Sequence, residues 1–192
     1  MTFLFHRDED HKNAANYNFD SPNALDFDLA YEKILALLRY EDVKIPIYDF
    51  ATHKRSVSSN FISNLNIFPN NRRDNEYTTL KCQPLLIFEG ILALYEKRFR
   101  DLMDLTIFVL TDDDIRLSRR IQRDTAERGR SVEDVLAQYN RFVKKSYDEF
   151  VKPSMKYADI IVPKGKSNTK GIEFVINNLK LQIPYDDLES IS

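Results

Sequence analysis

The sequence contains one cysteine, no tryptophan and only four glycines among its 192 residues. Because Cys82 has no second cysteine to pair with, an intrachain disulfide is excluded, and such a chain suits a reducing compartment. The longest apolar runs, at 91–95 and 105–110, fall far short of the roughly 20 residues that cross a bilayer. We therefore expect a cytoplasmic protein, with the nucleus as the alternative compartment, and no membrane partner.

A phosphate-binding loop of the pattern G-x-x-x-x-G-K-[ST] is also absent from the sequence. The stretch Gly165-Lys166-Ser167 would need a glycine at position 160, where the sequence has Ile160. An excess of positive charge is lacking too, since 28 Lys and Arg face 30 Asp and Glu, a net charge of -2. This balance argues against nucleic acid as a partner, and it requires any anion site to be local.

The length of the chain predicts one domain, 1–192, and its second half alternates short apolar runs with helical patterns. The apolar runs are 85–88, 105–110 and 159–162, and the helical patterns are 91–104, 113–128, 131–157 and 170–181. Apolar runs of this kind suit strands that are buried on both faces. Their alternation with helices predicts an α/β fold, a doubly wound parallel sheet with helices on both faces.

The first half of the chain is less regular. Ser21 and Pro22 favour a cap and first position for a helix over 22–39. Alternating apolar residues predict a strand over 43–50, with Pro46 favouring an edge strand or a hairpin arm. We expect residues 1–15 to be mobile and the polar stretch 55–83 to form a long loop or a hairpin insertion.

Glu89 directly follows the apolar run 85–88, at the expected carboxyl end of a strand. Functional groups of parallel α/β sheets gather at this edge. A carboxylate here could hold Mg²⁺, which takes oxygen ligands. Alternatively, it solvates the positive N-terminus of the following helix, and the pattern leaves both roles open.

Five arginines occur within twelve residues around a single glycine, Gly129: Arg119, Arg120, Arg123, Arg128 and Arg130. Spacings of three and four predict that Arg119, Arg120 and Arg123 share one side of a helix. Guanidinium groups bind phosphate oxygens in pairs, so the cluster is a candidate anion site. The alternative is a solvated helix face whose charge is offset by the nearby acids, Asp112 to Asp114, Asp124 and Glu127.

A third set of candidates lies in the first half, namely Asp20, Tyr48 and His53. An acceptor, an aromatic face and an imidazole can together bind a flat polar ring and its ribose hydroxyls. A capping aspartate, a core tyrosine and a surface histidine are the commoner roles of these residue types.

Seven stretches, in this order along the chain, carry a resemblance to a known family. They are Asn18-Phe-Asp-Ser-Pro-Asn-Ala24, Ile45-Pro-Ile-Tyr-Asp-Phe50 with Thr52-His53, Ile87-Phe-Glu-Gly-Ile91, 116–130, Gln138-Tyr139, Phe142-Val-Lys144 and 156–163. On these stretches the sequence resembles the uridine-cytidine kinase family of pyrimidine nucleoside kinases, over residues 16–182.

The resemblance implies a P-loop-kinase fold and phosphoryl transfer from ATP, with Mg²⁺, to the 5′-hydroxyl of uridine or cytidine, giving UMP or CMP in pyrimidine salvage. It implies that Glu89 helps to hold Mg²⁺ and that Arg123 and Arg128 belong to a lid over the ATP phosphates. The residues that it assigns to the nucleoside are Asp20 on the ribose, Tyr48 and His53 against the base, and Arg120, Arg130 and Gln138. It also implies a homo-oligomer.

The sequence departs from this family in one important respect. The family begins with a strand, a glycine-rich phosphate loop and an Asp-Ser/Asn-Phe-Tyr motif that supplies the catalytic base, and none of these occurs in the 192 residues. No residue is therefore assigned as catalytic, and we expect these 192 residues alone to be inactive. One interpretation is an N-terminally truncated uridine/cytidine kinase. The other is an inactive, pseudokinase-like nucleoside-binding or regulatory subunit that associates with a complete kinase.

Overall fold

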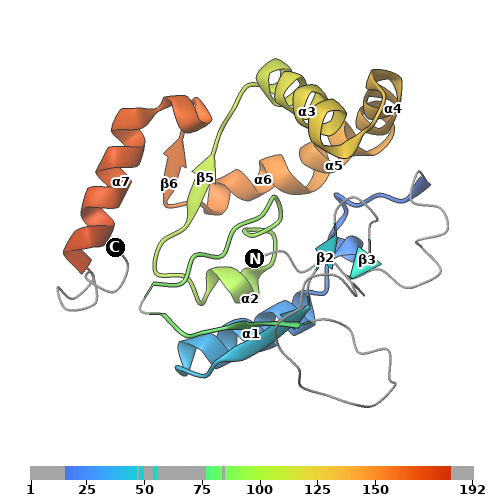
Figure 1. The fold of residues 1–192 in the computed structure, drawn as a ribbon. Helices are drawn as coiled ribbons and strands as arrows, with labels where there is room; N and C mark the ends of the chain where they lie inside the picture. The colour runs from blue at the N-terminus through green and yellow to red at the C-terminus, as the bar shows by residue number, and fades with distance from the viewer. Residues whose placement is uncertain (1–15, 47, 50–53, 56–76, 84, 183–192) are drawn as a thin grey trace, which may run out of the picture. The chain divides into compact units, whose positions relative to one another are not determined.

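The computed structural model describes residues 16–46, 48–49, 54–55, 77–83 and 85–182. The expectations for residues 1–15 and for 56–76 of the predicted insertion lie outside the described residues, as does His53. The chain divides into two compact units, one of residues 1–17 and 23–83, the other of residues 18–22 and 84–192. Figure 1 shows the helices and strands of both units.

In the first unit, helix α1 (Phe27–Leu38) contacts strand β1 (Val43–Pro46). The helix buries one face, at spacings of three and four: Phe27, Ala30, Ile34 and Leu37. Cys82 is tied to the same unit, because its N–H donates to Asp42 Oδ1 at 3.0 Å and its thiol to the carbonyl of Leu37 at 3.4 Å. The single cysteine therefore has a structural place beside the end of α1.

The predicted start of this helix is wrong. Pro22–Ala24 forms a separate 3₁₀ turn, and α1 begins only at Phe27. The cap is Asp26, whose Oδ1 accepts a hydrogen bond from the N–H of Leu29 at 2.9 Å. Ser21 and Asp26 are both good capping residues, so local composition does not distinguish the two starts, and the structure uses Asp26.

Two short antiparallel pairs belong to the first unit. Strand β1 pairs with β4 (Tyr77–Leu80), with Val43 opposite Leu80. Strand β2 (Tyr48–Asp49) pairs with β3 (Lys54–Arg55). The prediction of extended chain over 43–50 is confirmed for its described residues, and Pro46 ends β1, a position that tolerates its missing N–H.

The second unit contains a parallel pair, β5 (Ile107–Val109) and β6 (Ile160–Val162), which confirms the strands predicted there. Asp159 Oδ2 joins the two starts by accepting the N–H of Thr106 at 2.8 Å and its hydroxyl at 2.6 Å. The expected burial on both faces is wrong, since Val109 is 60% and Ile161 45% exposed. Burial of a strand face requires an element packed over it, and of the residues in these two strands Phe108 and Val162 are buried.

The apolar run at 85–88 is not a strand, contrary to the prediction. A strand requires a hydrogen-bonded neighbour, and among the described residues no strand pairs with this run. Ile87 is 68% exposed, whereas the ring of Phe88 stacks on Phe99 with 5.2 Å between the centroids. Aromatic packing therefore anchors the segment that leads to Glu89.

The helix predicted over 91–104 is also shorter than expected. Turns at 91–95 precede helix α2 (Lys97–Arg100). Arg100 Nη1 donates to the carbonyl oxygens of Leu94 and Tyr95, both at 2.7 Å, so a side chain satisfies groups that a longer helix would have paired. The segment still contributes to the core, because Leu92 and Phe99 are only 2% and 1% exposed.

Helix α3 (Asp113–Arg128) confirms the helix predicted over 113–128. Gly129 ends it in the left-handed conformation, with φ at 62°. Helix α4 (Val132–Gln138) begins at the predicted cap, Ser131, whose hydroxyl accepts the N–H of Asp134 at 3.0 Å. The two helices pack against each other at the Gly129 turn (Figure 1).

The helical path continues from α4 to residue 157, as predicted. It consists of the π-helical segment η3 (Tyr139–Val143), α5 (Lys144–Ser146), a second π-helical segment η4 (Tyr147–Val151), α6 (Lys152–Ser154) and the 3₁₀ turn η5 (Met155–Tyr157). Wide π-helical turns are rare and often occur next to functional residues. The first of them directly follows Gln138.

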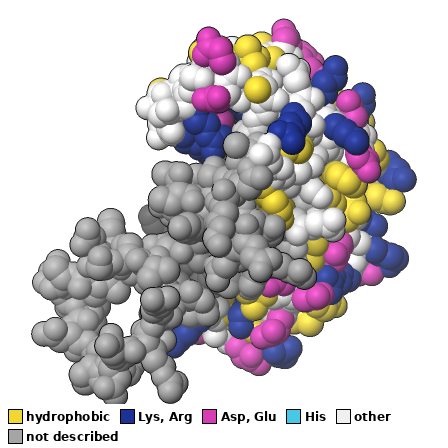
Figure 2. All heavy atoms as spheres, turned by 90° about the vertical axis from the view of Figure 1, so that its right-hand side faces the viewer, with side chains coloured by type: hydrophobic (Ala, Val, Ile, Leu, Met, Phe, Trp, Pro, Cys, Tyr) yellow, Lys and Arg dark blue, Asp and Glu magenta, His cyan; other side chains and the backbone are white. Residues whose placement is uncertain are grey.

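A 3₁₀ turn, η6 (Gly165–Ser167), and helix α7 (Thr169–Gln182) complete the second unit and confirm the helix predicted over 170–181. Acidic and basic side chains are interspersed on the described part of the face in Figure 2. None of the helices described has both the length and the apolar composition needed to cross a membrane.

We predict that Gly165→Ala destabilises the fold more than Gly129→Ala. Both glycines have positive φ, 55° and 62°, which disfavours alanine by about 1 kcal/mol. A Cβ at Gly165 would also stand 2.6 Å from Oγ1 of Thr111, whereas a Cβ at Gly129 meets open space. The free energies of unfolding in urea measure the difference.

Thr111→Ala provides the control, because it removes the atom that the new methyl group would meet. In that background the loss caused by Gly165→Ala should fall to that of Gly129→Ala. Equal losses in the wild-type background would contradict the role of the close approach.

Candidate functional site

Four arginines surround one buried carboxylate in the second unit. Asp124 of α3 is 0% exposed. Its Oδ1 accepts hydrogen bonds from Arg123 Nε at 2.8 Å and Arg128 Nη1 at 3.1 Å. Its Oδ2 lies 3.5 Å from Arg130 Nη1 and 3.7 Å from Arg120 Nε. We call these five side chains the Asp124 cluster.

The helical repeat and the glycine turn build this cluster. Arg120, Asp124 and Arg128 follow one another at intervals of four and therefore lie on one side of α3. The left-handed Gly129 then reverses the chain, and the N–H of Arg130 donates to the carbonyl oxygen of Asp124 at 3.1 Å. The same turn returns the guanidinium of Arg130 to the carboxylate.

Arg119 does not belong to the Asp124 cluster, although it lies four residues before Arg123 on α3 as predicted. Arg119 is exposed, and its Nη1 lies 3.6 Å from the point where a Cβ on Gly165 would stand. Successive residues of a helix are rotated by about 100°, so the neighbour of Arg120 is directed away from Asp124. Arg119 therefore offers a control for substitutions in the cluster.

Gln138 of α4 joins two of the arginines. Its Oε1 accepts hydrogen bonds from Arg120 Nη2 at 2.8 Å and Arg130 Nη1 at 3.1 Å. Both arginine side chains are only 19% exposed. The packing of α4 on α3 thus brings together three of the residues predicted to bind the nucleoside.

The cluster carries more positive than negative charge, with four guanidinium groups around the carboxylate of Asp124. Burial lowers the pKa of Arg120 and of Arg128. Repulsion from Arg123 lowers that of Arg128 further, whereas at Arg120 the charges of Asp20 and Asp124 oppose the fall. Guanidinium groups stay protonated in proteins, so this strain is relieved by an anion rather than by loss of a proton. The arrangement can bind phosphate oxygens.

Asp20 is held near the same arginines. Burial raises the pKa of its carboxyl, and the charges of Arg120 and Arg123 partly oppose this rise. Its own N–H donates to Asn18 Oδ1 at 3.1 Å, and Asn18 Nδ2 donates to Oγ of the buried Ser146 at 2.9 Å. A half-buried acceptor beside guanidinium groups can bind a ligand hydroxyl.

Three predicted site residues are not connected to the cluster by described contacts. Glu89 is exposed at the end of the run 85–88, and no group of three or more metal-ligating side chains occurs among the described residues. Tyr48 lies in β2 of the other unit, and His53 lies outside the described residues. Their roles, like those of the other site residues, stay predictions.

Sequence reasoning missed the central position of Asp124, which it considered only as a surface counter-charge. Its spacing of four from both Arg120 and Arg128 was the available signal. The link from Asn18 to Ser146 spans 128 positions, and no local pattern could have indicated it.

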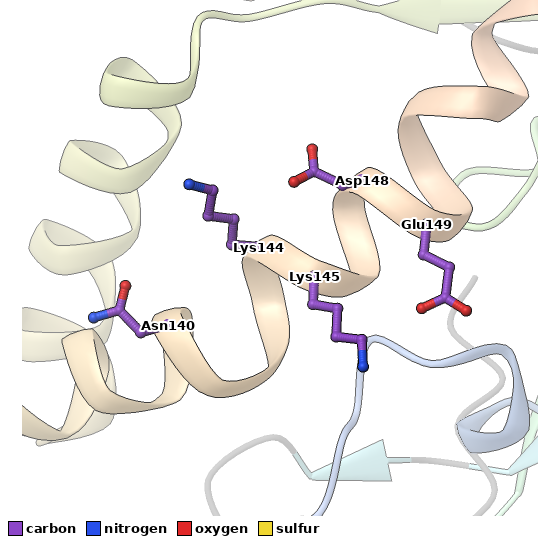
Figure 3. A pocket seen from close by; sticks show the side chains of 5 residues that line it. All are labelled: Asn140, Lys144, Lys145, Asp148 and Glu149. Atoms are coloured by element: carbon purple, nitrogen blue, oxygen red, sulfur yellow. The ribbon is translucent and has the colours of Figure 1, made fainter.

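A shallow hollow lies elsewhere in this unit, along the helical path through α5. Figure 3 shows that its five lining side chains spread around one helix rather than converge: Asn140, Lys144, Lys145, Asp148 and Glu149. None of them is a predicted site residue. The Asp124 cluster is the stronger candidate site.

We predict that the stability of Asp20→Asn relative to the wild type increases as the pH rises from acid to neutral. The raised pKa means that the folded protein holds this proton more tightly than the unfolded chain. The wild type therefore loses stability as the pH rises through the raised pKa, whereas asparagine does not titrate. Urea denaturation at a series of pH values measures the difference.

A difference between Asp20→Asn and the wild type that is constant with pH would refute the raised pKa.

Comparison with known proteins supplies the family. A model of the phosphoribulokinase / uridine kinase family matches residues 4–170. "Uridine-cytidine kinase A" of Dictyostelium discoideum is 45% identical over 169 residues, 88% of this chain and 30% of that protein. "Uridine-cytidine kinase-like 1" of Mus musculus is 40% identical over 173 residues, 90% of this chain and 28% of that protein. "Uridine kinase" of Streptococcus thermophilus is 41% identical over 174 residues, 89% of this chain and 74% of that protein.

The chain spans about a third of the length of several of these relatives, and about three quarters of the bacterial one. The match covers both units, including the Asp124 cluster, and it confirms the resemblance derived from the sequence motifs. The chain belongs to the phosphoribulokinase / uridine kinase family.

Proposed function

We propose that the chain forms the nucleoside-binding and lid part of a uridine/cytidine kinase. The reaction moves the γ-phosphoryl group of ATP to the 5′-hydroxyl of uridine or cytidine, giving UMP or CMP in pyrimidine salvage. The observation that carries the proposal is the Asp124 cluster, with its excess of positive charge and with Gln138 and Asp20 beside it. The names of the relatives supply the substrate class.

We assign one side of the cluster to the nucleoside. Asp20 accepts a ribose hydroxyl, and Tyr48 and His53 contact the base. Arg120, Arg130 and Gln138 complete this side, since their shared hydrogen bonds give them a fixed arrangement. When the nucleoside binds, its ribose hydroxyl replaces water at the Asp20 carboxylate. A buried acceptor is costly to leave without a hydrogen bond, so this replacement favours binding.

We assign the other side to ATP. Arg123 and Arg128 bind its phosphates, and Glu89 contributes one carboxylate to Mg²⁺. A single exposed carboxylate fits Mg²⁺ in this setting, because this ion usually keeps several waters and takes its remaining ligands from the phosphates. With Mg²⁺, ATP supplies the phosphoryl group, and the arginines stabilise the charge that develops during transfer.

The remaining parts of the reaction are assigned to residues outside these 192. We propose that the phosphate loop, the first strand and the base that accepts the 5′-hydroxyl proton belong to a preceding segment, so that β5 and β6 are part of a larger doubly wound parallel sheet. In the alternative, the chain is an inactive regulatory subunit beside a complete kinase. In both cases we propose a cytoplasmic protein that works as an oligomer.

We predict that Arg123→Ala and Arg128→Ala weaken the binding of inorganic triphosphate far more than that of uridine. Each substitution removes a charge-assisted hydrogen-bond donor, which contributes about 1.5–3 kcal/mol, or roughly 10- to 100-fold in affinity. Calorimetry with each ligand measures the two affinities. Arg119→Ala, on the same helix but away from Asp124, should change neither.

Equal weakening of uridine and triphosphate by both substitutions would contradict the assignment of this pair to phosphate. It would favour a general structural role for the arginines.

We also predict that the 192-residue polypeptide binds uridine but forms no UMP above background when MgATP is supplied. Without a phosphate loop and a base, two contributions that each supply roughly 10²-fold or more are lacking. Calorimetry measures binding, and a coupled assay measures turnover. Asp20→Ala should reduce the uridine affinity, and guanosine should bind more weakly than uridine.

Robust UMP formation by the purified polypeptide would show that the missing parts are wrongly assigned. A folded polypeptide that releases no heat with uridine would refute the nucleoside site itself.

A further inference from the structure

The carboxylate of Asp124 divides the four arginines into two pairs. Oδ1 accepts from Arg123 at 2.8 Å and Arg128 at 3.1 Å, and Oδ2 faces Arg130 at 3.5 Å and Arg120 at 3.7 Å. The first pair is the one proposed for phosphate, and the second pair is the one proposed for the nucleoside. The two oxygens of one rigid, planar group thus each face one half of the proposed site.

The two pairs are held unequally. The Oδ1 pair donates to Asp124 at 2.8 and 3.1 Å, whereas in the Oδ2 pair Arg130 makes a long hydrogen bond of 3.5 Å and Arg120 lies at 3.7 Å. Both members of the Oδ2 pair are closer to Gln138, at 2.8 and 3.1 Å, than to the carboxylate. Nε of Arg120 is buried, and among the described residues it has no hydrogen-bond acceptor, since Oδ2 at 3.7 Å is too far. A small rotation of the carboxylate would close this gap and move Oδ1 relative to Arg123 and Arg128.

A simple counter-ion does not require this placement. Exposed carboxylates on α3 can offset positive charge at the surface, as Asp113 does for Arg116. Asp124 is instead completely buried, where a charge is retained only with close partners. Its carbonyl oxygen also accepts the N–H groups of Gly129 and Arg130, so the same residue fixes the turn between Arg128 and Arg130.

We propose that Asp124 is a positioning residue that couples the two halves of the site, so that a nucleoside on the Arg120–Arg130 side orients Arg123 and Arg128 for phosphate. This inference rests on the proposed function. Because coupling between two ligands is reciprocal, triphosphate must strengthen nucleoside binding by the same factor.

The experiment measures the affinity of the 192-residue chain for uridine and for inorganic triphosphate, each with and without saturation by the other. In the wild type, each ligand should strengthen the other by about fivefold or more, a typical coupling between sites. In Asp124→Asn, which keeps the shape but loses the charge, this factor should fall to about one. Glu127→Gln makes the same chemical change at an exposed position of α3 and should leave the factor unchanged.

Two further readouts separate positioning from a general loss of structure. Asp124→Glu keeps the charge but displaces both oxygens, so it should also abolish the coupling. In the wild type, uridine should shift the ¹⁵N resonances of Arg123 Nε and Arg128 Nε, which lie on the proposed phosphate side. This second readout needs no variant and holds even where the substitutions prevent folding.

Coupling that persists in folded Asp124→Asn would overturn the inference. So would a wild type that binds both ligands independently, or unchanged Arg123 and Arg128 resonances on saturation with uridine. A wild type that binds neither ligand would instead refute the proposed function, so the two failures are distinguishable.

Discussion

The interaction on which the second unit depends is the burial of the Asp124 carboxylate among guanidinium groups. A buried charge loses its hydration, and removal of its partners leaves an uncompensated ion, which costs about 3–5 kcal/mol. Asp124 meets this requirement with arginines that come from its own helix and from beyond the Gly129 turn. This ion cluster requires three features of the unit: the length of α3, the left-handed Gly129 that ends it, and the packing of α4 through Gln138.

Asp20 is a second carboxylic acid near the same arginines, and burial affects it more than their charges do. Burial raises its pKa, although the nearby guanidinium groups favour the charged form. Asp124 accepts hydrogen bonds from three arginines, Arg123, Arg128 and Arg130, whereas Asp20 is held through its main chain to Asn18 and onward to Ser146. Its carboxyl group is therefore less committed to internal partners than that of Asp124, which suits a role in binding a ligand hydroxyl.

Local patterns predicted the elements whose causes are local. The periodicity of 113–128, the glycine after it and the capping Ser131 gave α3 and the start of α4. The run 85–88 failed as a strand because a strand depends on a neighbour distant in sequence, which composition does not reveal. For the site, spacing placed Arg120, Arg123 and Arg128 on α3, whereas the burial of Asp124 and the position of the Arg119 guanidinium near Gly165 are known only from the structure.

The excess of positive charge in the Asp124 cluster links stability to ligand binding. Four guanidinium groups are brought close together; burial lowers the pKa of Arg120 and Arg128, and repulsion from Arg123 lowers that of Arg128 further. Asp124 offsets one of the four charges and Asp20 lies near Arg120 and Arg123, so positive charge remains for a bound phosphate to offset. A ligand that binds only the folded state stabilises it by an amount that grows with the logarithm of its concentration relative to Kd. The same repulsion that weakens the free fold therefore provides part of the free energy with which an anion binds, because the anion relieves it.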